Sequence, residues 1–329
     1  MCKVMMMAGV TQETREKTWL FVKEMAKEIS PGNQDGCGYS AMASDGSVFG
    51  ERWHVNSEAF VNRELSPPIS DFEGDLLEQY LGAIKRKQFP VKYSKFGSLQ
   101  FDSMTAITLH TRFATSGKEF FNTHPFIRGS TSLIHNGVIR NASELEIKQS
   151  TCDSEAILNL YVKHKVADSV KSIQRVADKL QGYYACGVFA QSKSHGAIMD
   201  IFKCDSANLQ AAYVKELKTM VFSTNVNDIK SVCNRLGFTV VNDFIFDNNT
   251  LLRIDAIDGS VIDSVKFVST QTSHVTKPKK NKKYRKNLDL PIEPISINSP
   301  IMRNWKAEEI EIEPNEWLYQ GDWYEKKKT

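Results

Sequence analysis

The chain begins Met1-Cys2-Lys3-Val4-Met5-Met6-Met7-Ala8-Gly9-Val10, a cysteine at the second position followed by an apolar run. Because residues 3 to 10 are apolar on both faces and end in glycine, they predict a fully buried strand. Cys2 then lies at the edge of a sheet. Removal of Met1 would leave a thiol and a free α-amine on one residue. Both groups have unperturbed pKa values of about 8, so this residue can supply a nucleophile and its base.

The composition is that of a soluble globular protein. The chain has 329 residues, of which 41% are hydrophobic, enough for one large domain or two small ones. Lys and Arg number 42 and Asp and Glu 39, so the overall charge implies neither a nucleic-acid nor a membrane partner. The apolar run after Lys3 is too short for a signal peptide, and no other run is long enough to cross a bilayer. We therefore expect a cytoplasmic protein.

The cysteines lie far apart and form no C-x-x-C motif, which argues against a zinc site or a disulfide scaffold. We interpret all but the first as scattered thiols in a reducing compartment, and the sequence indicates neither a metal nor a cofactor. The six positions are Cys2, Cys37, Cys152, Cys186, Cys204 and Cys233.

Helical and strand periodicities follow one another between residues 3 and 268. Helices are predicted at 12–29, at 75–87, opening within 150–156, at 167–180 and at 227–236. Strands are predicted at 48–53, 105–115, 132–134, 183–191, 196–203 and 219–222, and the glycine-rich stretch 34–43 is predicted to lead into a further strand. Two hairpins are predicted, one over 244–255 with its turn at the asparagines and one turning at 258–260. Strands in both halves with helices grouped between them favour an α+β sandwich over a doubly wound parallel sheet.

The composition changes at about Ser269. A basic run at 277–286 is followed by prolines, an acidic stretch at 308–316 and an aromatic end. Such a segment cannot form a core, so we interpret 1–268 as the folded domain and 269–329 as a mostly disordered tail. The tail is either a solvated appendage or a docking peptide, and its basic run allows weak contact with nucleic acid.

Polar side chains gather between residues 110 and 155 in a pattern that packing alone does not explain. A cysteine enzyme that cleaves a carboxamide needs N–H donors for the oxyanion, and an amino-acid substrate also needs partners for its two charges. Asn136 and Gly137 can supply the donors, Arg112 can bind a carboxylate, and Asp153 can bind an ammonium. The structural alternatives are an ion-pair role for Arg112 and a helix N-cap role for Asp153.

Five motifs accompany Cys2 in one order: Asp35-Gly36-x-Gly38, His110-Thr111-Arg112-x-Ala114-Thr115, Asn122-x-His124-Pro125-Phe126, His135-Asn136-Gly137 and Asp153-Ser154-Glu155. In this order and at these spacings, the sequence resembles the class II glutamine amidotransferases, the glutaminase family with an N-terminal cysteine. The resemblance covers about residues 2 to 268 and implies a four-layer αββα fold.

The resemblance also implies site roles: Cys2 as nucleophile, Asn136 and Gly137 as oxyanion hole, Arg112 and Asp153 as clamps on L-glutamine, and Thr115 and His124 as residues that line or brace the pocket. The implied reaction is attack of the thiolate on the side-chain amide, loss of ammonia, and hydrolysis of the γ-glutamyl thioester to glutamate.

Three residues depart from the family pattern. Lys3 stands where many members have glycine, and Phe113 and Ser116 replace the Trp and His of the glucosamine-phosphate synthase branch, so that pathway is not assigned. No synthase domain follows residue 268, so we expect any ammonia acceptor to be a separate protein.

Three other readings stay open from the sequence. The same fold can serve an amidohydrolase that acts on a γ-glutamyl compound or another amide. It can also serve a binding protein without turnover. A third hypothesis makes His110, His124 and His135 metal ligands together with Asp153, although their spacing matches no common zinc pattern.

Overall fold

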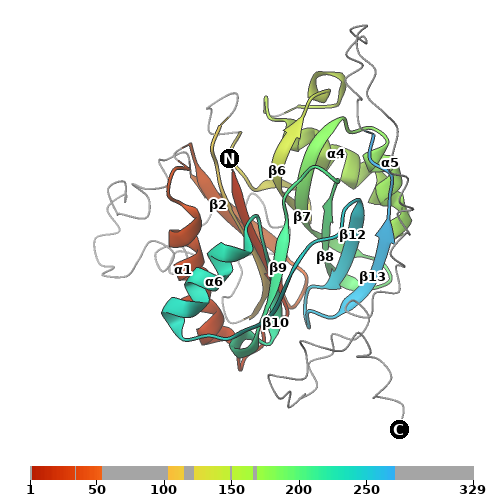
Figure 1. Ribbon diagram of the computed structural model, residues 1–329. Helices are drawn as coiled ribbons and strands as arrows, with labels where there is room; N and C mark the ends of the chain where they lie inside the picture. The colour runs from red at the N-terminus through yellow and green to blue at the C-terminus, as the bar shows by residue number, and fades with distance from the viewer. Residues whose placement is uncertain are drawn as a thin grey trace, which may run out of the picture.

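Two sheets pack against each other as layers in the computed structural model, with helices on the outer face of each (Figure 1). The structure describes residues 2–33, 35–53, 103–114, 122–148, 150–165 and 169–270. The predicted helix at 75–87, Thr115 and the tail beyond residue 270 lie outside these ranges.

The first sheet has seven strands in the order β11-β9-β10-β1-β4-β2-β3. Their bounds are β1 Lys3–Ala8, β2 Cys37–Ala43, β3 Val48–Trp53, β4 Met104–Thr111, β9 Gln210–Val214, β10 Thr219–Ser223 and β11 Val240–Ile245. The strand that follows Cys2 is therefore central, with β10 on one side and β4 on the other. The expectation that Cys2 lies at the edge of a sheet is wrong in this respect, because Cys2 precedes the middle strand.

The second sheet has six strands in the order β13-β12-β8-β7-β6-β5. Their bounds are β5 Phe126–Arg128, β6 Thr131–Ile139, β7 Gly182–Ser192, β8 Gly196–Lys203, β12 Thr250–Asp255 and β13 Val261–Lys266. Every pairing between these strands, and every pairing in the first sheet, is antiparallel. This arrangement excludes a doubly wound parallel sheet for the described residues.

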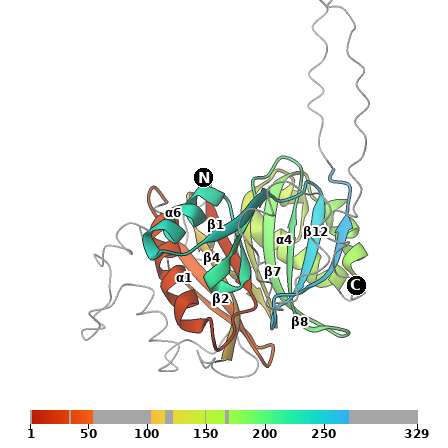
Figure 2. The same cartoon turned by 60° about the horizontal axis from the view of Figure 1, so that its bottom comes forward.

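Helices α1 (Arg15–Ile29) and α6 (Val226–Leu236) cover the first sheet, and α4 (Asp153–Lys165) and α5 (Ile173–Ala177) cover the second (Figure 2). The layers are therefore α, β, β and α, as the resemblance implies. The helix predicted at 167–180 is shorter, because its start is a 3-10 turn, η5 (Val170–Ser172), that passes into α5. Two further 3-10 turns are η4 (Ala142–Glu144) and η6 (Lys215–Leu217).

The run of methionines in β1 is buried on both faces, as predicted. Met5 and Met7 pack in the cluster beneath α1 and α6, whereas Met6 packs between the two sheets. A side chain at Gly187 of β7 would collide with the sulfur of Met6. The absence of a side chain at this position therefore lets the sheets approach each other directly under β1.

The predicted hairpin over 244–255 is wrong. β11 pairs with β9 in the first sheet, while β12 pairs with β8 and β13 in the second. The asparagines do form a turn, with Asn249 at φ 49°, but the chain uses it to cross between the sheets. Phe246 is buried at this crossing, where its N–H donates to the carbonyl of Leu209 at 3.0 Å. The second predicted hairpin is confirmed, because β12 and β13 pair around the turn at 258–260.

Candidate active site

Cys2 lies against the backbone of residue 113. The pairing of Lys3 with Thr111 brings the residues just beyond β4 alongside Cys2. The Cys2 thiol lies 3.5 Å from the Phe113 carbonyl oxygen and 3.4 Å from the Phe113 backbone nitrogen, whose N–H points at the sulfur. Phe113 itself is 47% exposed.

Burial raises the pKa of the Cys2 thiol above its usual value, because the charged thiolate loses solvation. The Phe113 N–H and the positive charge of Arg112 act in the opposite direction, and the negative charge of Asp153 raises the pKa further. The two residues predicted to clamp a substrate, Arg112 and Asp153, therefore act on the pKa of the thiol in opposite directions.

The segment that carries Arg112 is held by the Asp35-Gly36 motif. The Arg112 N–H donates to the Gly36 carbonyl at 2.7 Å, and the Asp35 N–H donates to the Arg112 carbonyl at 3.1 Å. One carboxylate oxygen of Asp35 accepts the Ala114 N–H at 2.8 Å. These bonds fix residues 112 to 114, so the acidic residue and glycine of this motif have a structural role beside the thiol.

Asn136 and Gly137 occupy β6, a strand of the second sheet that contacts β1. The Asn136 side chain is nearly buried, and its Nδ2 donates to Thr224 Oγ1 at 3.4 Å. Gly137 has φ 153°, and a side chain there would collide with the carbonyl oxygen of Tyr183. Glycine is therefore required at this position, next to the amide predicted to stabilise an oxyanion.

Asp153 is the first residue of α4, and its carboxylate faces β6. Its Oδ2 accepts the Ile139 N–H at 2.6 Å, across the gap between helix and sheet. The other oxygen, Oδ1, lies 3.5 Å from the Cys152 sulfur. This carboxylate is therefore bonded to a strand rather than serving only as a cap of its own helix.

Ser154 links two of the three histidines that the motifs contain. Its hydroxyl oxygen lies 2.9 Å from His124 Nε2 and 2.9 Å from His135 Nδ1. The His110 ring packs on that of His124, with centroids 3.9 Å apart. Burial lowers the pKa of each imidazole, that of His110 to about 3, so all three are neutral at pH 7. His124 thus braces the start of α4.

Among the described residues, no group of three or more His, Cys, Asp or Glu side chains has the arrangement of a metal site. The metal hypothesis therefore finds no cluster in this part of the chain. Equally, none of the described helices has the length and apolar character needed to span a membrane.

Lys3, the departure from the family pattern, points away from this centre. Its ammonium forms an ion pair with Asp228 of α6 at 3.2 Å. Neighbouring residues of a strand point to opposite faces, so Lys3 lies on the helix-covered face and Cys2 on the face toward the second sheet. A charged residue directly after Cys2 is thus accommodated by a partner on α6.

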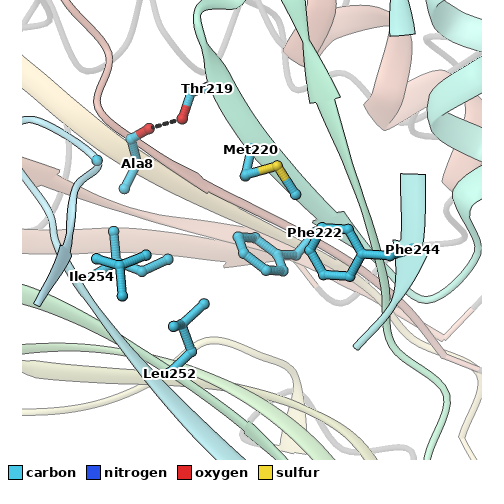
Figure 3. A pocket seen from close by; sticks show the side chains of 9 residues that line it. Ala8, Thr219, Met220, Phe222, Phe244, Leu252 and Ile254 are labelled. Carbon is cyan, nitrogen blue, oxygen red and sulfur yellow. Dashed lines mark hydrogen bonds between the residues drawn. The ribbon is translucent and has the colours of Figure 1, made fainter. Parts of the chain in front are cut away.

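A small apolar cavity lies at the far end of β1 from Cys2, between the two sheets (Figure 3). Its lining contains no titratable side chain, and a hydrogen bond of 2.6 Å from Thr219 Oγ1 to the Ala8 carbonyl crosses one side. The lining residues are Ala8, Thr219, Met220, Phe222, Phe244, Leu252, Ile254, Gly259 and Val261. None of these residues belongs to the candidate site.

Of the seven residues predicted for the site, six are described. Arg112 directly follows β4, the strand that pairs with β1, and the charges of Arg112 and Asp153 both act on the Cys2 thiol. Asn136, which precedes Gly137 in β6, is joined to β1 through Thr224, which bonds both Asn136 and Val4. His124 is buried behind them. Sequence reasoning missed Thr224, which no motif singles out.

Comparison with known proteins gives short matches in sequence and a broader match in fold. No family model matches the chain. The glutamine–fructose-6-phosphate aminotransferase (isomerizing) of Xanthomonas campestris pv. campestris is 35% identical over 96 residues, 26% of this chain and 16% of the relative. The enzyme of the same name from Buchnera aphidicola is 39% identical over 95 residues, 25% of this chain and 16% of the relative. The chain thus spans about a sixth of the length of these relatives.

Among solved structures, the chain is similar to B. subtilis glutamine phosphoribosylpyrophosphate amidotransferase complexed with ADP and GMP. The TM-score is 0.51 at 16% identity, covering 80% of this chain and 49% of that chain. This likeness concerns the fold alone and confirms the predicted α+β sandwich. Motifs, sequence matches and fold together relate the chain to the class II glutamine amidotransferases, the family that its sequence resembles.

Proposed function

We propose that the chain is a glutaminase domain that hydrolyses the side-chain amide of L-glutamine and releases ammonia. One observation on the Cys2 thiol carries the proposal. The thiol accepts a hydrogen bond from the Phe113 N–H, and its pKa is affected by the charges of both Arg112 and Asp153. A nucleophile between a cation and an anion suits a substrate that carries both charges on one carbon.

Substrate binding uses these two charges. Arg112 binds the α-carboxylate through its guanidinium fork, and Asp153 binds the α-ammonium through the carboxylate oxygen that Ile139 does not occupy. Thr115, in the same sequence motif as Arg112, keeps the substrate-binding role that the resemblance implies, while His124 acts indirectly by bracing Ser154.

Chemistry begins once Met1 has been removed. Because burial raises the pKa of the thiol, few molecules hold a thiolate at neutral pH, and the reaction needs a base beside the sulfur. The α-amine of Cys2 takes the thiol proton as sulfur attacks the amide carbon. The oxyanion that forms accepts N–H bonds from Asn136 Nδ2 and the Gly137 backbone.

Collapse of this intermediate breaks the carbon–nitrogen bond. The amine returns its proton to the leaving nitrogen, and ammonia departs from a γ-glutamyl thioester. Water then adds to the thioester carbon and gives its proton to the same amine, after which glutamate leaves and the thiol is restored. Each step moves a proton through one group, so no metal or cofactor is required.

We further propose that the released ammonia is used by a separate acceptor protein. The named relatives are called aminotransferases, and the matched region covers only 16% of each of them. The part of a relative that receives the amino group can therefore lie outside the matched region. Co-purification of partners with the full chain identifies the acceptor.

The direct test measures glutamate and ammonia release from L-glutamine by the mature full-length protein, with intact mass to verify removal of Met1. Cys2→Ala is expected to lower kcat at least about 10³-fold, because it removes the nucleophile. Cys233→Ala, which removes a buried thiol in α6, serves as the matched control and should retain activity. Equal turnover by Cys2→Ala and wild type would contradict the proposal, as would cleavage of γ-glutamyl peptides with free glutamine inert.

A further inference from the structure

Thr224 joins the strand that begins at the nucleophile. It lies between β10 and Asn225, the residue that caps α6 through its side chain. The Val4 N–H donates to Thr224 Oγ1 at 3.0 Å, and the Thr224 N–H donates to the Val4 carbonyl at 3.2 Å. These reciprocal bonds fix the Thr224 hydroxyl two residues from Cys2.

The same oxygen also contacts the second sheet. Asn136 Nδ2 donates to Thr224 Oγ1 at 3.4 Å, a long bond of the kind that tightens when substrate is bound. A hydroxyl oxygen accepts two hydrogen bonds, and here they come from Val4 and Asn136. One atom thereby connects the nucleophile strand to the amide of the proposed oxyanion hole.

The geometry points to Thr224 as a positioning residue for the oxyanion hole. A side-chain amide has two N–H groups, and when one bonds to Thr224 the plane of the amide is fixed and the other can be directed at the oxyanion. This inference rests on the proposed glutaminase function and deepens it. No family motif includes Thr224, and its role arises from its place between two sheets.

The expected effect follows from when the oxyanion exists. Its charge develops only in the transition state, so misdirecting Asn136 lowers kcat and leaves ground-state binding by Arg112 and Asp153 in place. Removing a whole oxyanion donor costs about 10²–10³ in kcat. Because Thr224 acts through that donor, its loss should cost less than the loss of Asn136 itself.

The test compares Thr224→Val, which keeps the shape and removes the acceptor, with Thr224→Ser, which keeps the oxygen. For Thr224→Val we expect kcat to fall about 10- to 100-fold, with the KM for glutamine within about twofold of wild type. Thr224→Ser should retain most of the activity, since its hydroxyl restores the acceptor. Thermal unfolding of each variant reports whether the fold is intact.

A double-mutant cycle separates positioning from a merely structural role. Once Asn136→Ala has removed the donor, adding Thr224→Val should lower kcat no further, because both changes remove the same hydrogen bond to the oxyanion. Multiplicative effects, or a change confined to KM, overturn the role of Thr224 while the glutaminase function stands. If mature wild-type protein releases no ammonia from glutamine, the proposed function fails and this role fails with it.

Discussion

The reactivity of Cys2 depends on charges that the sequence places more than a hundred positions away. The pKa of its thiol is raised by burial, lowered by Arg112 and raised by Asp153. A cation favours the thiolate and an anion disfavours it, so removing each should move the titration in opposite directions. In Arg112→Gln the pKa should rise above that of wild type, and in Asp153→Asn it should fall.

The measurement is the rate at which iodoacetamide alkylates Cys2 in the mature protein as a function of pH, followed by mass spectrometry of the N-terminal peptide. This small neutral reagent needs neither substrate clamp, so its rate reports the thiolate alone. Midpoints that stay unchanged in both variants would show that these charges lie too far from the sulfur to act on a substrate there.

At this scale the sequence predicted residues whose chemical type is rare or distinctive. A second-position cysteine and His-Asn-Gly stand out because few residues can perform their chemistry, and in the structure the charges of Arg112 and Asp153 act on the Cys2 thiol. Thr224 could not be found in this way. Its hydroxyl resembles many others in the chain, and its importance comes only from two hydrogen bonds that join distant segments.

Helix α4, which begins at Asp153, is bonded through one buried tyrosine to a buried ion pair of the second sheet. Tyr161 donates to Asp200 at 2.6 Å, and Arg253 binds the same carboxylate through two bonds of 2.8 Å. Removing one partner of such a pair leaves a buried charge unpaired. We expect Arg253→Met to lower the free energy of unfolding by about 3–5 kcal/mol, measured by urea denaturation.

Arg235→Met provides the matched control for that variant. Arg235 also contacts two carboxylates, those of Glu24 and Glu28, but its side chain is 42% exposed. Its loss should cost less than about 1 kcal/mol, because water screens exposed ion pairs. Equal costs at the two arginines would refute the view that burial makes the Arg253 pair important.

Elements were predicted well where their boundaries depend on local pattern and poorly where they depend on partners. The strands predicted at 183–191 and 196–203 match β7 and β8 nearly to the residue. The segment from 244 to 255 shows the limit. Asn248 and Asn249 favour a turn whether the chain folds back on itself or crosses to another sheet. In the structure the chain crosses, and Phe246 is buried between the sheets at this point.

The histidine cluster makes the packing of the whole molecule sensitive to acid. His110 belongs to the first sheet, His135 to the second, and His124 to the segment between them. Burial lowers the pKa of all three, while in the unfolded chain each returns to about 6.5. Below that pH the unfolded state binds more protons, so stability present above pH 6.5 should be lost progressively as the pH falls.

A His110→Phe variant tests this linkage by removing one titrating ring of similar size. Between about pH 5.5 and 4.5 the free energy of unfolding of wild type should fall more steeply than that of the variant, by up to about 1.4 kcal/mol per pH unit. Exposed His195→Asn is the control and should keep the wild-type slope. Parallel curves for His110→Phe and wild type would contradict a buried neutral histidine.

The layer order of the molecule could be anticipated from the family resemblance, but the order of strands within each layer could not. β1 lies between β10 and β4, two strands that come from opposite halves of the sequence. No local pattern states which apolar segments become neighbours, because hydrophobic burial has no direction. The same reasoning explains why the central position of the first strand was not predicted.

That central position has a consequence for how the protein fails. A strand that is paired on both sides can be released only if both of its ladders of hydrogen bonds break. The strand that directly follows Cys2 is therefore held on both sides. We therefore expect release of β1 and loss of the activity proposed for Cys2 to occur together.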